Sequence, residues 1–179
     1  MASKASSSAS QTQTLSSISD QKEFPQHVSM TRTWLNKLGI DKPIPQSCET
    51  RGFYSHFFGS FIKLNDIKRG RISCTIAVKP QIINAFGTLH GGSLLSLIEL
   101  LSIACARTVI AEDKELFLGE IRASYLSAAL NHSEVLAEAS VVKSGRNVTM
   151  VALEFKLKKT GNLMYIAHTT FYNIPVAKL

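Results

Sequence analysis

The stretch from Gly91 to Ile110 constrains the fold of this chain more than any other feature. Apolar residues cover nearly every side of its helical wheel, and a helix of that kind has to be covered by other structure. Its most apolar part, Ser93 to Ile110, contains Glu99 in its middle and Arg107 near its end, and this part falls just short of the roughly 20 residues that cross a bilayer. It therefore predicts a buried central helix and no membrane span. Its apolar residues are Leu94, Leu95, Leu97, Ile98, Leu100, Leu101, Ile103, Ala104, Val109 and Ile110.

Extended segments are predicted before this helix. Residues 72–79 alternate, with one face formed by Ile72, Cys74, Ile76 and Val78 and the other by Ser73, Thr75 and Lys79. That alternation predicts a half-buried strand. The aromatic stretch 53–64 is also expected to be extended, with a turn over 66–70 between the two segments.

Four further strands are predicted after the helix, over 116–126, 135–141, 153–157 and 163–172. Ser144-Gly145-Arg146 and Thr160-Gly161-Asn162 are expected to form hairpin turns. Two strands, a long apolar helix and four strands indicate an α+β fold, in which an antiparallel sheet wraps around the helix.

The ends of the chain differ from this domain. Residues 1–28 begin with a Ser/Thr/Gln/Ala-rich segment that has almost no bulky apolar side chains, so we expect disorder there. The domain is expected over 29–174, beginning with a short helix over 29–38 that Gly39 ends and that caps the domain edge. Residues 175–179 are expected to be an exposed tail.

Composition narrows the classes of function. The 179 residues carry a formal net charge of +7, which suits a polyanionic partner such as nucleic acid, an anionic membrane or a phosphorylated cofactor, or is a generic basic surface. No block of five like charges occurs, which argues against nucleic acid. Cys48, Cys74 and Cys105 are scattered, so we expect reduced thiols and neither a zinc site nor a disulfide framework.

The segment Asn84-Ala85-Phe86-Gly87-Thr88-Leu89-His90-Gly91-Gly92 directly precedes the helix. Two glycines at a helix start allow close approach to the backbone. The free N–H groups there, with the positive end of the helix dipole, would stabilise a developing negative oxygen. Asn84 and His90 add polar groups, and His90 is interpreted either as a participant or as a hydrogen-bonded structural histidine.

Glu99 is the acid for which a catalytic role is expected. It is the only acid between Asp66 and Glu112, and a carboxylate in an apolar helix is costly unless it is paired or protonated. Two structural alternatives stay open: an ion pair at an interface, or an outward position at the helix edge. Together with the glycine pair, Glu99 predicts a hydrolytic site.

These residues resemble the hotdog-fold thioesterases of the phenylacetate-degradation type, including the acyl-CoA thioesterase 13 group. The resemblance implies hydrolysis of an acyl-CoA without metal or organic cofactor. Glu99 would be the base or nucleophile, the Gly91 N–H would polarise the thioester carbonyl, and Asn84 would hold water or substrate. The loop Lys143-Ser144-Gly145-Arg146-Asn147 would bind CoA, although an ordinary basic hairpin is the alternative. The resemblance further implies a homodimer or homotetramer with active sites shared between subunits.

Two positions depart from this family's pattern. Close relatives often carry Asp at the position of Glu99, and some carry Ser where this chain has Leu118. A non-catalytic acyl-CoA-binding protein is therefore the main rival function, followed by a dehydratase of the same fold. The last residues, Ala177-Lys178-Leu179, resemble a peroxisomal address, so we expect the peroxisome and its import receptor, with the cytoplasm as the alternative.

Overall fold

The computed structural model describes residues 26–40 and 42–176. The chain divides into two compact units, Met1–Gln46 and Ser47–Leu179. Of the disorder expected over 1–28, residues 1–25 lie outside the described residues, as does the peroxisomal-type ending over 177–179, so both stay predictions. Residues 26–28 are helical, which differs from the expectation.

The described part of the first unit contains the helix α1 (Gln26–Lys37), close to the helix predicted over 29–38. Gly39 follows it with a φ of 81°, in the left-handed region that glycine adopts readily, so the predicted stop is confirmed. None of the described side chains of α1 is buried, and Trp34 is 57% exposed. Its predicted role as a cap on the domain edge stays a prediction.

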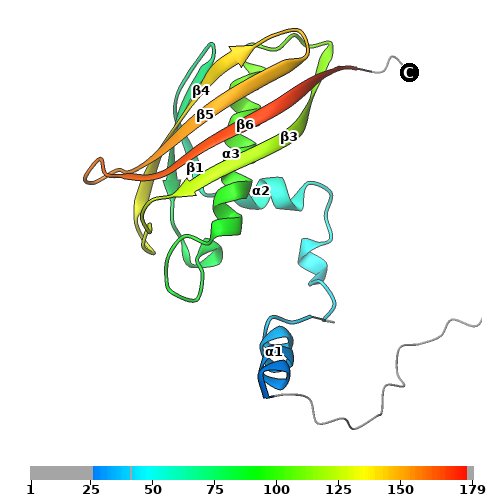
Figure 1. Cartoon of the computed structure of the whole chain (residues 1–179), viewed down its shortest axis with the longest axis vertical. Coiled ribbons are helices and arrows are strands. Elements are labelled where there is room, and N and C mark those ends of the chain that lie inside the picture. The colour runs from blue at the N-terminus through cyan, green and yellow to red at the C-terminus, as the bar shows by residue number, and fades with distance from the viewer. Residues whose placement is uncertain (1–25, 41, 177–179) are drawn as a thin grey trace, which may run out of the picture. The chain divides into compact units, whose positions relative to one another are not determined.

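The second unit follows the predicted order of strands around a helix. After the short turn η1 (Gln46–Cys48), its elements are α2 (Phe53–Gly59), β1 (Ile62–Lys68), β2 (Arg71–Ala77), η2 (Pro80–Ile82), α3 (Gly91–Arg107), β3 (Lys114–Tyr125), β4 (Glu134–Ser144), β5 (Val148–Leu157) and β6 (Leu163–Pro175). The strands form one antiparallel sheet in the order β1-β2-β4-β5-β6-β3. Figure 1 shows α3 lying across one face of this sheet. The predicted α+β architecture is confirmed.

The core lies between α3 and the inner face of the sheet. Alternate residues of the strands point inward, among them Ile76, Phe155 and Phe171, which have no exposed surface. Leu94 and Leu97 of α3 pack into the same cluster. Burial of these large apolar side chains is the main contribution to stability here, about 1.5–3 kcal/mol for each one fully buried.

The segment 53–64 was predicted to be extended, which is wrong for 53–59, the residues of α2, and confirmed for 62–64, the start of β1. Phe53, Phe57 and Phe61 recur every four residues, which is a helical spacing, and the first two lie one turn apart on α2 with stacked rings. Phe57 meets Phe58 and Phe61 edge-to-face, with centroids 5.2 and 5.1 Å apart. Packing between aromatic rings that are close in sequence therefore overrode the strand preference of these residues.

The central helix is covered on one side and not all round as expected. Its sheet-facing residues are buried, whereas Leu95 is 38% exposed and Glu99 is half-buried. The helix ends at Arg107, where Thr108 accepts a hydrogen bond from the Gly70 N–H at 2.7 Å. In the described part of the chain, no helix is long and apolar enough to span a membrane.

Candidate active site

The loop before α3 is a compact, hydrogen-bonded turn built around Asn84. The Asn84 Oδ1 accepts the backbone N–H groups of Phe86 at 2.9 Å and Thr88 at 3.2 Å, and its Nδ2 donates to the Thr88 Oγ1 at 2.9 Å. Gly87 has a φ of 74°, which its lack of a Cβ permits. Asn84 thus shapes the loop that leads into the helix, and its side chain is largely occupied by that task.

His90 is the N-cap of α3. Its Nδ1 accepts the Gly92 N–H at 3.0 Å, which satisfies one of the free donors at the helix start. This is the hydrogen-bonded structural arrangement that the sequence analysis left open for His90. Gly91 is the first helical residue, and its own N–H meets no acceptor among the described residues.

Glu99 lies two turns further along α3, beside a small cavity between α2 and α3. The cavity holds about 150 Å³ and is lined by Tyr54, Ser55, Phe58, Ser96, Glu99, Leu100 and Ile103. The carboxylate of Glu99 has no ion-pair or hydrogen-bond partner in the described part of the chain, which makes it available to an incoming group. The two structural alternatives for Glu99 were an ion pair at an interface and an outward position at the helix edge. In a single chain, Glu99 has the outward position.

Gly91 and Glu99 cannot act on the same thioester from one helix. They are eight residues apart, and a rise of 1.5 Å per residue separates them by about 12 Å along the axis. A carbonyl oxygen that touches the Gly91 N–H would therefore lie far from the Glu99 carboxylate of the same chain. A single chain therefore does not bring these two groups together.

The predicted CoA-binding residues form the tip of the β4–β5 hairpin, as the Ser144-Gly145-Arg146 turn predicted. Asn173 of β6 fixes this tip with two hydrogen bonds. Its side-chain Nδ2 donates to the Gly145 carbonyl at 2.8 Å, and its backbone N–H donates to the Asn147 carbonyl at 2.8 Å. Thr149 in turn donates to the Asn173 Oδ1 at 3.1 Å. Lys143 and Arg146 are exposed and form no ion pair with the described residues.

This hairpin lies at the opposite end of α3 from Gly91. The Val141 N–H, two residues before Lys143, donates to the Gly70 carbonyl at 2.8 Å, and Gly70 contacts Thr108 just past the helix. The other end of the helix meets the end of β3, where the Tyr125 hydroxyl donates to the Gly91 carbonyl at 3.2 Å. Since α3 has 17 residues, about 25 Å separate its ends.

Leu118 occupies the strand position where some relatives carry serine. It packs against the core and pairs with Phe171 of β6, directly before a bulge at Gly119. This position therefore supplies no polar group to the region around Glu99.

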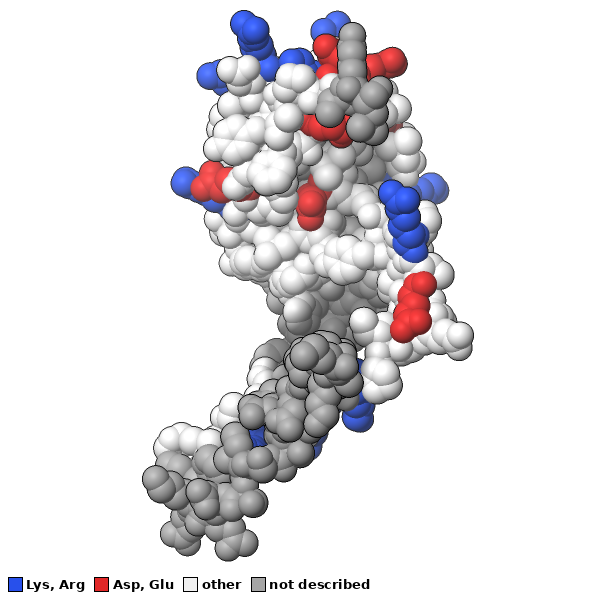
Figure 2. Space-filling model, turned by 90° about the vertical axis from the view of Figure 1, so that its right-hand side faces the viewer, with Lys and Arg blue, Asp and Glu red and all other residues white. Residues whose placement is uncertain are grey.

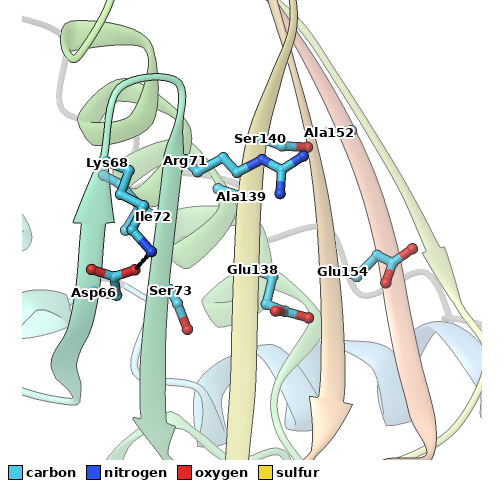
Figure 3. Close-up of a pocket in the computed structure, with 10 residues that line it drawn as sticks. All are labelled: Asp66, Lys68, Arg71, Ile72, Ser73, Glu138, Ala139, Ser140, Ala152 and Glu154. Carbon is cyan, nitrogen blue, oxygen red and sulfur yellow. Dashed lines mark ion pairs between the residues drawn. The ribbon is translucent and has the colours of Figure 1, made fainter.

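A second cavity, of about 420 Å³, lies on the sheet face away from α3 (Figure 3). Both signs of charge line it, with Lys68 paired to Asp66 at 2.9 Å. The two remaining carboxylates, Glu138 and Glu154, are both bound by Lys156, at 3.0 and 2.8 Å. None of the residues expected to act in catalysis lines this groove, and its acids are already paired.

No three His, Cys, Asp or Glu side chains gather as metal ligands within residues 26–40 and 42–176. The expectation of a reaction without a metal or organic cofactor stays a prediction.

Sequence reasoning missed one residue that the fold brings to the site. The Tyr54 hydroxyl of α2 is hydrogen-bonded to the Ser96 Oγ, one turn before Glu99 on the same helix. The two residues are 42 positions apart, so no local pattern could have paired them.

This chain is similar in sequence and in fold to several known proteins. Residues 86–163 match the family model described as the thioesterase superfamily. A Caenorhabditis elegans protein named as an esterase is 30% identical over 98 residues, which cover 55% of this chain and 57% of that protein. Human acyl-coenzyme A thioesterase 13 is 26% identical over 95 residues, 53% of this chain and 67% of that protein.

The solved structure of zebrafish thioesterase superfamily member 2 superposes with a TM-score of 0.64 at 23% identity, covering 70% of this chain and 88% of that one. This likeness concerns the fold. The chain spans a little more than half the length of the nematode relative. Residues 86–163 are thus similar to the thioesterase superfamily, and the sheet that wraps around α3 has the hotdog fold of the solved thioesterase structure.

Proposed function

We propose that this chain is an acyl-CoA thioesterase, which hydrolyses an acyl-CoA to a free acid and CoA. The observation that carries this proposal is the unpaired, half-buried Glu99 carboxylate on a helix whose first residue, Gly91, offers a free N–H. The superfamily match and the name of the human relative support a thioester as the substrate. The +7 net charge suits a phosphorylated carrier such as CoA.

The chemistry follows from these two groups. Glu99 removes a proton from water while the water oxygen bonds to the thioester carbon, and the Gly91 N–H stabilises the negative carbonyl oxygen. The carbon–sulfur bond then breaks, and the CoA thiolate takes the proton. In the alternative that Glu99 itself attacks, the carbon–sulfur bond breaks, the CoA thiolate leaves and an anhydride forms. Water then cleaves the anhydride to the free acid and the Glu99 carboxylate, and its other proton goes to the thiolate.

Each active site is proposed to lie between two subunits. In a two-fold dimer with antiparallel α3 helices, the helix start of one chain meets the acid of its partner. The roughly 12 Å between Gly91 and Glu99 supports this arrangement, because a single chain cannot use both. Figure 2 faces the side where β3 and α2 lie, and charged side chains are sparse across the middle of this surface of the sheet domain, which suits a contact between copies.

The β4–β5 hairpin is proposed to bind the phosphates of CoA through Lys143 and Arg146. Its place at the C-terminal end of α3 supports this, since that end would adjoin the partner's Gly91 in an antiparallel pair. Replacing Arg146 with alanine should raise KM for acyl-CoA and leave KM for the matching acyl-pantetheine, which lacks the nucleotide, unchanged. An equal rise for both substrates would remove the hairpin from phosphate binding.

A panel of acyl-CoAs tests the activity. Purified protein is incubated with each, and free thiol is followed with a chromogenic disulfide against a no-substrate blank. Release of thiol above the blank is expected for at least one acyl group. Binding of acyl-CoA by calorimetry without thiol release would instead favour the non-catalytic rival, for which Leu118 is the best argument.

The shared site is tested by mixing two inactive variants. Gly91→Pro removes the N–H, and the extended His90 before it (φ −66°, ψ 133°) tolerates a following proline. Glu99→Ala removes the acid. When the two are unfolded and refolded together, about half of the dimers are mixed, and each mixed dimer has one intact site, so about a quarter of the activity should return. If the mixture stays as inactive as its parents while wild type refolds, the site lies within one chain.

A further inference from the structure

The cavity beside Glu99 has walls of two kinds. Phe58, Leu100 and Ile103 are apolar, and Tyr54 lies edge-to-face against Phe58 with ring centroids 4.8 Å apart. The polar atoms at the cavity belong to Glu99 and to three hydroxyl groups. A mostly apolar recess with a few polar groups at one side is the usual form of a site that binds the apolar part of a small molecule.

Tyr54 is held in place by a short hydrogen-bond chain. The Ser96 Oγ donates to the Gly92 carbonyl at 3.0 Å. A serine hydroxyl has one proton, so the Tyr54 hydroxyl is the donor in its bond to Ser96. The chain Tyr54–Ser96–Gly92 thus ties an aromatic ring that is 61% exposed to the helix that carries Glu99.

The size of the cavity limits what it accepts. Its volume of about 150 Å³ is that of an apolar cavity known to take up a benzene molecule. A group of about six carbons fills such a space, and a longer chain needs the tyrosine ring to move.

We propose that Tyr54 is a specificity-determining residue: tied to Ser96, it closes the recess beside Glu99 and limits the acyl group to about six carbons. This inference rests on the proposed acyl-CoA substrate and adds the size of its acyl group. The part of a longer chain beyond this length enters the recess only when the tie is broken or the ring is removed.

Binding of S-alkyl-CoA thioethers tests the proposal without any hydrolysis, because a thioether has no carbonyl to attack. CoA, S-hexyl-CoA and S-dodecyl-CoA are titrated into the full chain by calorimetry. Each methylene that enters the recess should tighten binding about fourfold. S-hexyl-CoA should therefore bind at least tenfold tighter than CoA, and S-dodecyl-CoA no tighter than S-hexyl-CoA.

Substitutions that break the Tyr54–Ser96 hydrogen bond should change the ratio of the affinities for S-dodecyl-CoA and S-hexyl-CoA in a defined pattern. Tyr54→Ala should make S-dodecyl-CoA bind at least tenfold tighter than S-hexyl-CoA. Tyr54→Phe and Ser96→Ala should each give a smaller shift in the same direction, and the double variant should give no more than either single one, because both break the same bond. Tyr172→Ala, which removes an exposed tyrosine on β6, is the matched control and should keep the wild-type ratio.

The inference is overturned if wild type binds S-hexyl-CoA no better than CoA, or if Tyr54→Ala keeps the wild-type ratio. Because the readout is binding, these results are separate from the thiol-release panel. A protein that releases no thiol but shows the expected ratios would lose the proposed activity and keep the size-limited acyl recess.

Discussion

The two faces of α3 have opposite properties although they share one helix. Toward the sheet, Leu94, Leu97 and Ile98 have no exposed surface. Away from the sheet, the helix presents Ser96 and Glu99, both half-buried, and Leu95, which is 38% exposed. Neighbouring residues of α3 thus point in different directions, some into the core and some toward the proposed site. Substitutions on the inward face should change the free energy of unfolding, and substitutions on the outward face should change turnover.

The largest effect is expected from Glu99→Gln on the outward face. Loss of a general base costs about 10²–10⁴ in rate, so kcat should fall at least a hundredfold. The free energy of unfolding should change by no more than about 0.5 kcal/mol, because Glu99 has no ion pair in the described structure. Glu112→Gln, at an exposed acid after the helix, is the control. Retained turnover in Glu99→Gln would exclude Glu99 from the mechanism.

Leu97→Ala on the inward face should lower stability and leave turnover nearly unchanged, the opposite of Glu99→Gln. Removing a fully buried leucine costs about 2–5 kcal/mol of stability, which urea unfolding would measure, while the activity of the folded fraction should persist. Leu95→Ala is the matched control on the other face and should cost about 0.5 kcal/mol or less in a single chain. A larger, concentration-dependent cost at Leu95 would show that another copy covers the outward face.

The reactivity of the cysteines should also differ between the two faces of α3. Burial raises the pKa of the Cys105 thiol, on the inward face, to about 11, and burial also raises the pKa of Cys74. At pH 8 the thiolate fraction of Cys105 should therefore be about a hundredfold below that of a thiol with the ordinary value of 9.0. A chromogenic disulfide should label the half-buried Cys48 rapidly and the other two only after unfolding.

A second rapidly reacting thiol in the native protein, or one that persists in a Cys48→Ser variant, would contradict this assignment. The sign of the linked pH effect also follows. Because the pKa of Cys105 is raised on folding, its contribution to stability is present below pH 9 and is lost as the pH rises toward 11.

The smallest effect is expected from two serines of α3. Ser102 is fully buried, and its hydroxyl has no partner among the described residues. Ser102→Ala should therefore stabilise the protein by up to about 1 kcal/mol in urea unfolding, because a buried unsatisfied hydroxyl is unfavourable. Ser96→Ala removes a bonded hydroxyl and should not stabilise. A loss of stability in Ser102→Ala would indicate that a water molecule satisfies the Ser102 hydroxyl.

The sequence predicted those parts of the fold whose pattern is local. Strand alternation and the glycine turns placed both hairpins, and the apolar stretch placed α3. The segment 53–59 was misread because aromatic residues favour strands in isolation, whereas here their four-residue spacing serves packing within α2. The outward face of α3 was misread because apolar content does not tell whether the covering structure comes from the same chain.

The site was predicted in its residues more than in its geometry. The glycine pair and Glu99 were found from spacing, but spacing did not show that the Asn84 side chain is occupied by its own loop. Nor could it show Tyr54, whose partner is distant in sequence. Contacts of this kind depend on how the elements pack, which a single sequence does not display.

The strand order has a consequence for how the chain is made. Among the described strands, β3 pairs only with β6, and β2 finds its second neighbour only when β4 exists. Synthesis runs from the N-terminus at about 5–20 residues per second, and β6 ends 50 residues after β3. For roughly 3–10 s on the ribosome, α3 and β3 therefore exist before β6 is available to pair with β3 and complete the burial of α3. During this interval the nascent chain would need a chaperone most.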